Sequence, residues 1–364
     1  ASINPEPQTF VLKPTPPFWM TWWFYTGSGL LCLLVIYSIV KFRERNLRLE
    51  KKHLELMVLS RTQEIVRQKE EIETQRDELQ ESSTIIEQKN QAITDSIRYA
   101  QRIQLATLPY YDVIYKNLTD TLILYKPKDI VSGDFYAYAK KDTKHIFAVA
   151  DCTGHGVPGA FMSMIGTNLF NQIINEKGIT QPAEILRHLD IGIERALKQD
   201  ESENHDGMDM IICSLDFTNK QFEYAGANRP LWIMHQQPTN TLYPQGPGLR
   251  AELYGEYMSM IKPDKVPIGG FLRLSESSFT NHLFIFQPGD AIYLFTDGFA
   301  DQFGGEHGRK LLSKRFRDYL ISIRDKPVKV QEDLLNLYFE NWKQNREQVD
   351  DVLVVGIWHH GNAT

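Results

Sequence analysis

Residues 43–104 contain neither Pro nor Gly and are dense in Glu, Lys, Arg and Gln. Because Pro and Gly most disfavour a helix interior, this composition predicts one long unbroken helix that ends at Pro109. An apolar residue recurs at every seventh position of the segment: Val58, Ile65, Ile72, Leu79, Ile86, Ile93 and Ala100. A sustained period of seven is typical of a coiled coil, and we expect a parallel homodimer.

The positions three residues after this apolar seam are mostly polar, which makes the expected pairing weak. They are Arg61, Gln68, Gln75, Ser82 and Lys89. Two interpretations of the segment remain open. It is either a solvated spacer helix or the stalk of a metastable dimer whose pairing an input signal can shift.

The 19 residues from Trp22 to Val40 carry no charge. As a helix they would extend roughly 28 Å, close to the hydrocarbon thickness of a bilayer. Aromatic residues gather at one end and basic residues at the other: Trp19, Trp22, Trp23 and Tyr25, then Lys41, Arg43, Arg45, Arg48, Lys51 and Lys52. We therefore predict a single transmembrane helix with everything after residue 41 in the cytoplasm. A signal peptide or a buried core helix are the alternatives, but the run lacks a basic n-region and a cleavage site.

The bulk composition excludes some classes of partner. A formal net charge of −6 and a pI of about 6.0 indicate no nucleic-acid-binding patch. Cys32, Cys152 and Cys213 lie in unrelated contexts, so we expect reduced thiols rather than a disulfide framework.

From Leu118 onwards the pattern changes to short apolar runs separated by helical patterns. The expected strands are 118–125, 144–150, 210–215, 221–225, 230–234, 279–286, 290–296 and 352–358, and the expected helices are 158–176, 182–199, 308–323 and 328–345. Helices grouped between antiparallel-type strands predict a layered α+β domain rather than a βαβ array.

Aspartates stand at the tips of four of these apolar runs, beside glycines and without a matching Lys or Arg. They are Asp134 in SGDFY, Asp151 in DCTGHG, Asp297 in TDG, and the pair Asp350-Asp351. In an antiparallel hairpin of 135–139 with 144–150, the first two lie side by side at the open end. Antiparallel pairing of 290–296 with 352–358 does the same for the others. Such carboxylate clusters hold hard divalent cations, so we predict one two-metal hydrolytic centre.

Each residue near these motifs also has a simpler interpretation. A single Asp is more often a turn former or a helix cap than a metal ligand. His155 is either a general acid near the leaving oxygen or a loop residue before the next helix. The thiol of Cys152 has no basic surroundings to activate it, so its backbone carbonyl is the more relevant group. We interpret Asp209 as structural and Asn228 as a turn residue that borders the site in the alternative.

The chain resembles the type 2C (PPM) metal-dependent protein phosphatases, and more closely their bacterial SpoIIE/RsbU branch. The matching stretches, in order, are VSGDFYAY, VADCTGHGVPGAFMSMIG, FEYAGANRPLWI, GDAIYLFTDGFADQFG and DDVLVVGIW. The resemblance as a whole spans about residues 118–360. The resemblance implies an αββα sandwich with two central antiparallel sheets.

The resemblance also implies the roles of individual residues toward two Mn²⁺ or Mg²⁺ ions. Asp151 would bridge the ions and the carbonyl of Cys152 would be a further ligand. Asp134, Asp297 and Asp350 match the remaining acids, and the role of Asp351 stays open. Where relatives often have a second Asp after the aromatic pair, this chain has Ala137.

The implied activity is hydrolysis of phosphoserine or phosphothreonine on a regulatory protein, which for this branch is usually a STAS-type anti-sigma-factor antagonist. A catalytically inactive module that only binds phosphoproteins is the alternative, and retention of all four acid positions argues against it. A sensor histidine kinase is disfavoured, because the chain lacks glycine boxes and has only His53 in the coil.

The expected organisation follows from these observations. It comprises an extracytoplasmic tail at 1–18, a transmembrane helix at 19–41 in the bacterial inner membrane, a coiled-coil signalling helix at 42–108 and a SpoIIE-like phosphatase domain at 109–361. The stretch 10–25 resembles the junction after a periplasmic Y_Y_Y-type sensor domain, which would make this chain part of a larger receptor. Ile93, Ile97, Ala100 and Gln104 share one helix face, so we expect rotation of the stalk to alter occupancy of the metal site.

Overall fold

A computed structural model of the chain describes residues 17–240, 251–270 and 279–359. The chain forms two compact units, Ala1–Lys89 and Asn90–Thr364. The second unit begins upstream of the boundary expected at residues 108 and 109, because the last turns of the long helix belong to it. Most of the expected tail at 1–18 lies outside the described residues.

The described part of the first unit, from residue 17 onwards, is almost entirely helix. A short 3-10 helix, η1 (Phe18–Met20), precedes the long helix α1 (Trp22–Thr107), whose final residues enter the second unit. Among the described residues, one helix has a window long and apolar enough to cross a membrane, and none of that window is buried. The apolar heptad residues from Val58 to Ile93 are each between 54% and 71% exposed. The seam that predicts pairing is therefore uncovered in the single chain.

The second unit contains two six-stranded antiparallel sheets. The first has the order β1 (Thr121–Lys126), β14 (Val352–Trp358), β11 (Ala291–Phe295), β6 (Leu231–Met234), β8 (Met258–Ile261) and β7 (Ala251–Tyr254). The second has the order β10 (His282–Phe284), β5 (Gln221–Ala227), β4 (Gly207–Asp216), β3 (Lys144–Cys152) and β2 (Phe135–Lys141), with β9 (Ile268–Gly269) beside β4. A small hairpin pairs β12 (Phe303–Gly304) with β13 (Arg309–Lys310).

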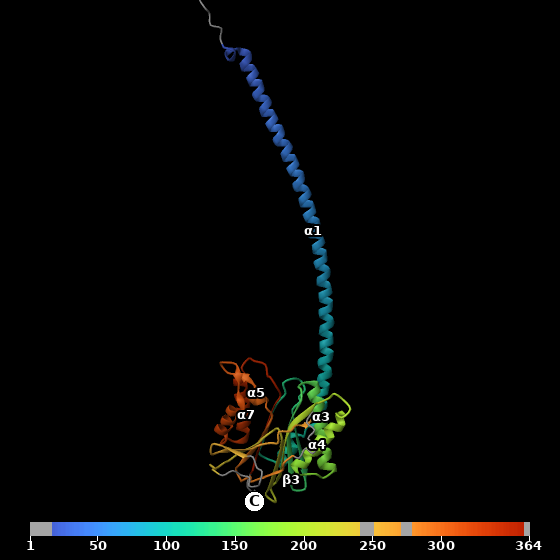
Figure 1. Cartoon of the computed structure of the whole chain (residues 1–364), viewed down its shortest axis with the longest axis vertical. Coiled ribbons are helices and arrows are strands. Elements are labelled where there is room, and N and C mark those ends of the chain that lie inside the picture. The colour runs from blue at the N-terminus through green and yellow to red at the C-terminus, as the bar shows by residue number, and fades with distance from the viewer. Residues whose placement is uncertain (1–16, 241–250, 271–278, 360–364) are drawn as a thin grey trace, which may run out of the picture. The chain divides into compact units, whose positions relative to one another are not determined.

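Helices cover the outer face of each sheet (Figure 1). On the second sheet lie α3 (Val157–Asn171), which continues as the π-helix η2 (Gln172–Glu176), and α4 (Pro182–Leu197). On the first sheet lie α5 (Gly298–Asp301), α6 (Leu312–Ile323) and α7 (Val328–Lys343), and a short helix α2 (Tyr111–Asn117) follows α1. These four layers confirm the predicted αββα sandwich.

The alternation of side chains along the central strands explains the layering. In β14, Leu353, Val355 and Ile357 pack into the core between the two sheets. Val352 and Val354 point the opposite way, into the core beneath the helices of the first sheet. Since successive residues of a strand face opposite sides, a strand that is apolar throughout must be buried on both faces.

Helix α3 lies against the loop before β2 with almost no side chain between them. A β-carbon on Gly159 would collide with the backbone of Gly133 and Gly154. Only glycine permits this approach at the helix surface. The contact places the first turn of α3 directly beside the SGD and TGHG segments.

Several elements differ from the sequence-based expectation at their ends or were not expected. The first expected strand begins at Thr121 rather than at 118, and the helix expected from 308 begins at Leu312 because β13 precedes it. Strands β7 and β8 were not expected. They lie at the edge of the first sheet, where all of β7 is only partly buried, so no continuous apolar run identifies it.

The two leucines Leu335 and Leu337 on α7 provide a matched test of this packing. Leu335 is fully buried beneath the first sheet, whereas Leu337 is 55% exposed. We expect Leu335→Ala to lower the free energy of unfolding by about 2–5 kcal/mol. Leu337→Ala should change it by less than about 0.5 kcal/mol. Denaturant unfolding of both variants measures the difference, and equal losses would contradict this placement of α7.

Candidate metal centre

The hairpin of β2 and β3 brings the first two aspartates together, as predicted. Phe135 pairs with Ala150, so Asp134 directly precedes β2 beside the end of β3, where Asp151 lies. The turn between the strands contains Asp142 with a φ of 54°. Asp134 is 2% exposed, and it therefore points into the protein rather than into solvent.

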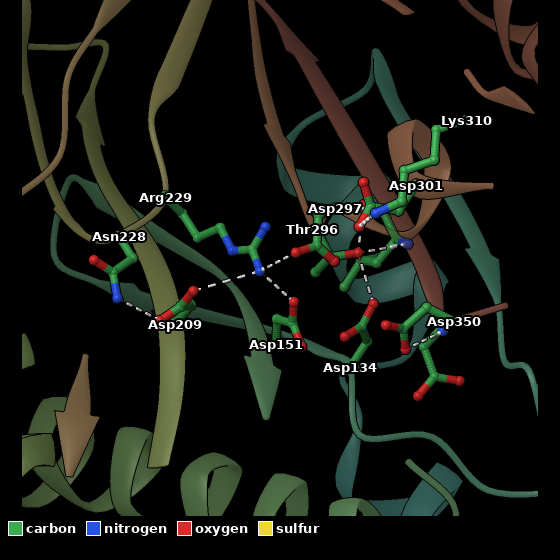
Figure 2. Close-up of polar contacts among 12 residues, drawn as sticks. Asp134, Asp151, Asp209, Asn228, Arg229, Thr296, Asp297, Asp301, Lys310 and Asp350 are labelled. Atoms are coloured by element: carbon green, nitrogen blue, oxygen red, sulfur yellow. Dashed lines mark hydrogen bonds and ion pairs between the residues drawn. The ribbon is translucent and has the colours of Figure 1, made fainter. Parts of the chain in front are cut away.

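The remaining predicted acids come from the other sheet. Asp297 follows β11, and Asp350 and Asp351 directly precede β14, its antiparallel neighbour. The Thr296 hydroxyl connects the two sheets (Figure 2), because it donates to Oδ2 of Asp134 at 2.6 Å and accepts from the Leu353 amide at 3.1 Å. The acids of the two sheets thus meet at one edge of the sandwich.

Asp351 is a buried anchor for the loop that carries Asp134. Its two carboxylate oxygens accept hydrogen bonds from the backbone amides of Lys128 and Gly133, both at 2.7 Å. The side chain of Asp350 instead accepts from the amide of Asp351 at 2.9 Å. Direct ligation by Asp351 stays a prediction, and the structure adds a positioning contact to it.

The expectation that these acids lack a matching cationic side chain is wrong. Nη2 of Arg229 contacts Oδ2 of Asp151, lies 3.0 Å from Oδ2 of Asp297 and 3.5 Å from Oδ2 of Asp209. Arg229 lies far from the aspartates in sequence, in the loop between β5 and β6, and only the fold brings it among them (Figure 2).

Asp209 and Asn228 also lie beside the acids, and Asp209, interpreted from the sequence as structural, contacts Arg229 within this cluster. Asp209 lies opposite Asp151 in the register of β3 and β4. The side-chain amide of Asn228 donates from Nδ2 to Oδ1 of Asp209 at 2.8 Å, and the backbone of Asn228 has a φ of 59°. The structure therefore agrees with both interpretations of Asn228, as a turn residue and as a residue that borders the site.

Burial and mutual repulsion perturb the acids. Burial raises the pKa of Asp134 well above its usual range, and the charge of Asp151 raises it further. Burial raises the pKa of Asp151 to about 7, with Arg229 opposing the shift and the charge of Asp297 adding to it. Burial also raises the pKa of Asp350. These carboxylates favour positive charge beside them.

His155 and Cys152 occupy different environments. His155 is more than half exposed, and its Nδ1 lies 2.9 Å from Oδ2 of Asp129. Cys152 is buried, and burial raises the pKa of its thiol well above the usual range. A thiol held protonated is no nucleophile, which agrees with the interpretation that only its backbone carbonyl matters.

Gln104, near the end of α1, is joined to the SGD segment. It is buried, its Nε2 donates to the Ser132 carbonyl at 2.6 Å and to Oγ of Ser163 on α3 at 2.7 Å, and its Oε1 accepts from the Ser132 amide at 3.2 Å. Ser132 Oγ in turn accepts from the Asp134 amide. A chain of hydrogen bonds therefore leads from α1 to a predicted ligand.

A second constellation of catalytic residue types proves to be structural. His235 contacts Oγ of Ser259 at 2.9 Å and Oδ2 of Asp290 at 3.4 Å, which resembles a serine-hydrolase triad. All three side chains are buried, and Asp290 also accepts from the amides of Gln236 and Gln287. Because a substrate has no access to these buried side chains, we interpret their hydrogen bonds as holding β6, β8 and β11 together rather than as a catalytic triad.

The donor set fits divalent cations in its chemistry. Within the ranges that the structure describes, no group of three His, Cys, Asp or Glu side chains is arranged to hold a metal ion as it stands. The guanidinium of Arg229 lies between carboxylates that the prediction assigns to the ions. Clustered carboxylate oxygens are the ligand type that Mg²⁺ and Mn²⁺ prefer.

Comparison with known proteins decides the family. The family model of stage II sporulation protein E (SpoIIE) matches residues 141–359. The chain belongs to the SpoIIE family of PP2C-type serine/threonine phosphatases. The family assignment confirms the resemblance of the sequence motifs, and phosphatases of this type use divalent Mg or Mn ions.

Individual relatives match about two thirds or more of the chain. Phosphoserine phosphatase RsbU of Bacillus subtilis (strain 168) is 26% identical over 253 residues, which are 68% of this chain and 67% of RsbU. The SiaA-PP2C domain of Pseudomonas aeruginosa has 29% identity and a TM-score of 0.63, covering 74% of this chain and 98% of that domain. The RsbU and RsbW domains of Rv1364c from Mycobacterium tuberculosis have 20% identity and a TM-score of 0.51, covering 67% and 61%, which shows the fold alone.

The raised carboxylate pKa values predict how the pH affects metal-free stability. Between the ordinary pKa of 3.8 and about 7, the folded state holds more protons on Asp151 than the unfolded state does. The free energy of unfolding should therefore fall as the pH rises through this range. Thermal unfolding of chelator-treated protein from pH 4 to 8 measures the trend. We expect Asp151→Asn to flatten it and Mn²⁺ to restore stability most at high pH, whereas a rise with pH would contradict the assignment.

Proposed function

We propose that this chain is a membrane-anchored, metal-dependent phosphatase that removes phosphate from phosphoserine or phosphothreonine of a regulatory protein. One observation carries the proposal: buried acids from two sheets meet at one edge, tied together by Thr296 and Asp134. The family supplies the reaction class. The clustered acids support the assignment of the site to this reaction.

Two Mn²⁺ or Mg²⁺ ions, when bound, would lower the pKa of a shared water and neutralise charge on the phosphate. Asp151 would bridge the ions, with Asp134, Asp297 and Asp350 as further ligands and the carbonyl of Cys152 completing the set. The Thr296 hydroxyl orients the carboxylate of Asp134. Asp351 holds the loop of Gly133 in place through its amide. His155 follows Asp151 in the DCTGHG segment and is more than half exposed, and we assign it as the candidate general acid for the leaving oxygen.

The proposed substrate class is a phosphorylated regulator, most specifically a STAS-type anti-sigma-factor antagonist. A similar protein from Bacillus subtilis bears the name phosphoserine phosphatase RsbU. The alternative of an inactive phosphoprotein-binding module would predict loss of an acid such as Asp151 or Asp297. Both residues are present and face the site.

Replacement of Asp151 tests the assignment of the reaction. Asp151→Asn removes the bridging charge while keeping the size of the side chain, so Mn²⁺-dependent turnover of an aryl phosphate should fall by more than about 100-fold. Asp325→Asn, on an exposed side chain far from the site in sequence, should leave turnover unchanged. Turnover of Asp151→Asn at the level of this control would refute the proposal.

We further propose that the apolar window of α1 anchors the chain in a bacterial inner membrane and that the heptad seam pairs two copies. The window is long and apolar enough to cross a bilayer, and the seam residues are exposed in a single chain. A second copy with the same period of seven would cover them. The full chain should then sediment with membranes, whereas a fragment of residues 43–364 should remain soluble and have the mass of a dimer.

The hydrogen bonds of Gln104 give the stalk a physical route to the metal site. Fragments 43–364 and 109–364 differ in the stalk and in Gln104, and we expect the shorter one to bind Mn²⁺ about 10-fold more weakly. Gln104→Ala in the longer fragment should reproduce part of this loss. Gln91→Ala, at an exposed position of the same helix, is the control. Identical rates and metal affinities in all four proteins would remove the coupling.

A further inference from the structure

Arg229 is the cationic residue at the centre of the carboxylate cluster. Its side chain is 12% exposed, and it reaches the site from the loop before β6 (Figure 2). Nη2 alone contacts Asp151, Asp297 and Asp209. Three carboxylates therefore share the single nitrogen Nη2.

The remainder of the guanidinium is not used by these contacts. Nε of Arg229 is buried and has no hydrogen-bond partner among the described residues. A guanidinium presents five N–H donors in a rigid planar fork, and a buried donor without an acceptor is costly. An acceptor group with two oxygens, such as a phosphate or a carboxylate, would satisfy Nε and a terminal nitrogen together.

Asp209 differs from the acids assigned to the cations. Its Oδ1 accepts from Asn228 at 2.8 Å, and its Oδ2 lies 3.5 Å from Nη2 of Arg229. Asn228 is itself fixed, because its backbone amide donates to the Asp264 carbonyl at 2.8 Å. Asp209 and Asn228 therefore form an anchor for Arg229 that does not depend on Asp151 or Asp297.

We propose that Arg229 binds the phosphoryl group of the substrate beside the metal centre, with Asp209 and Asn228 as its anchor. The inference rests on the proposed phosphatase function and deepens it. When cations compensate the charges of Asp151 and Asp297, the attraction of these acids for the guanidinium weakens. A phosphate dianion then becomes the strongest acceptor within reach of the fork, while Asp209 keeps the side chain in the site. Arg229 binds and orients the phosphate and transfers no proton.

Phosphate binding by full-length protein in detergent, loaded with Mn²⁺, tests the proposal. Isothermal titration with inorganic phosphate gives a dissociation constant that does not depend on turnover. We expect Arg229→Met to weaken phosphate binding by about 10- to 100-fold, the usual loss for a hydrogen-bonded charged partner. Arg229→Lys, which keeps the charge and loses the fork, should lie between. Arg187→Met, on an exposed arginine of α4 paired with Glu184, should match the wild type.

Three further measurements separate this role from that of a simple counterion. The Mn²⁺ affinity of Arg229→Met should be equal to or higher than that of the wild type, because a competing cation is removed. The KM for an aryl phosphate should rise in parallel with the phosphate dissociation constant. Asp209→Asn, which keeps Arg229 but weakens its anchor, should also weaken phosphate binding, by a smaller factor.

The outcomes are decisive in each direction. Unchanged phosphate affinity in Arg229→Met would overturn the proposal and leave Arg229 as a counterion of the acids. If Arg229→Met does not fold, as judged by circular dichroism, equal phosphate affinity of Arg229→Lys and the wild type would overturn it instead. Wild-type protein that binds phosphate through Arg229 but shows no Mn²⁺-dependent turnover would contradict the proposed function alone.

Discussion

Mutual repulsion among buried carboxylates is the constraint on which this structure depends. Two antiparallel sheets direct their aspartates to one edge, where burial removes the water that would otherwise screen them. Hydrogen bonds from Thr296, Lys128 and Gly133 and the ion pairs of Arg229 offset part of that cost. The negative charge that these contacts leave uncompensated makes this edge of the sandwich attract cations. The carboxylate repulsion that destabilises the metal-free fold is therefore also the basis of the proposed metal site.

The sequence was sufficient for the framework because its signals are local. Apolar runs with an Asp at one end locate β3, β11 and β14, and antiparallel pairing of neighbours follows from short connections. The layered α+β class, the long helix and the side-by-side placement of Asp134 and Asp151 were all predictable on this basis. The family motifs then fixed the order of the layers.

The rest depended on contacts between residues far apart in the chain. Arg229 carries no signal of its own in the stretch GANRP, and only the pairing of β4 with β5 in one sheet and of β6 with β11 in the other brings it to Asp151. In the sequence Gln104 is one polar residue on a helix face, and the sequence does not predict its hydrogen bonds to Ser132, which is 28 residues away. The edge strand β7 is only partly buried, so its sequence lacks the continuous apolar run from which a buried strand can be predicted.

The contact of Gly159 with the backbone of Gly133 and Gly154 has a mechanical consequence. Where side chains separate two elements, rotamer changes can absorb a small displacement. At this contact the backbone of α3 lies directly against the backbone of the two loops, so no side chain can adjust its rotamer between them. A movement of α3 toward these segments would therefore displace the backbone of Gly133 and Gly154 directly, because no side chain lies between them.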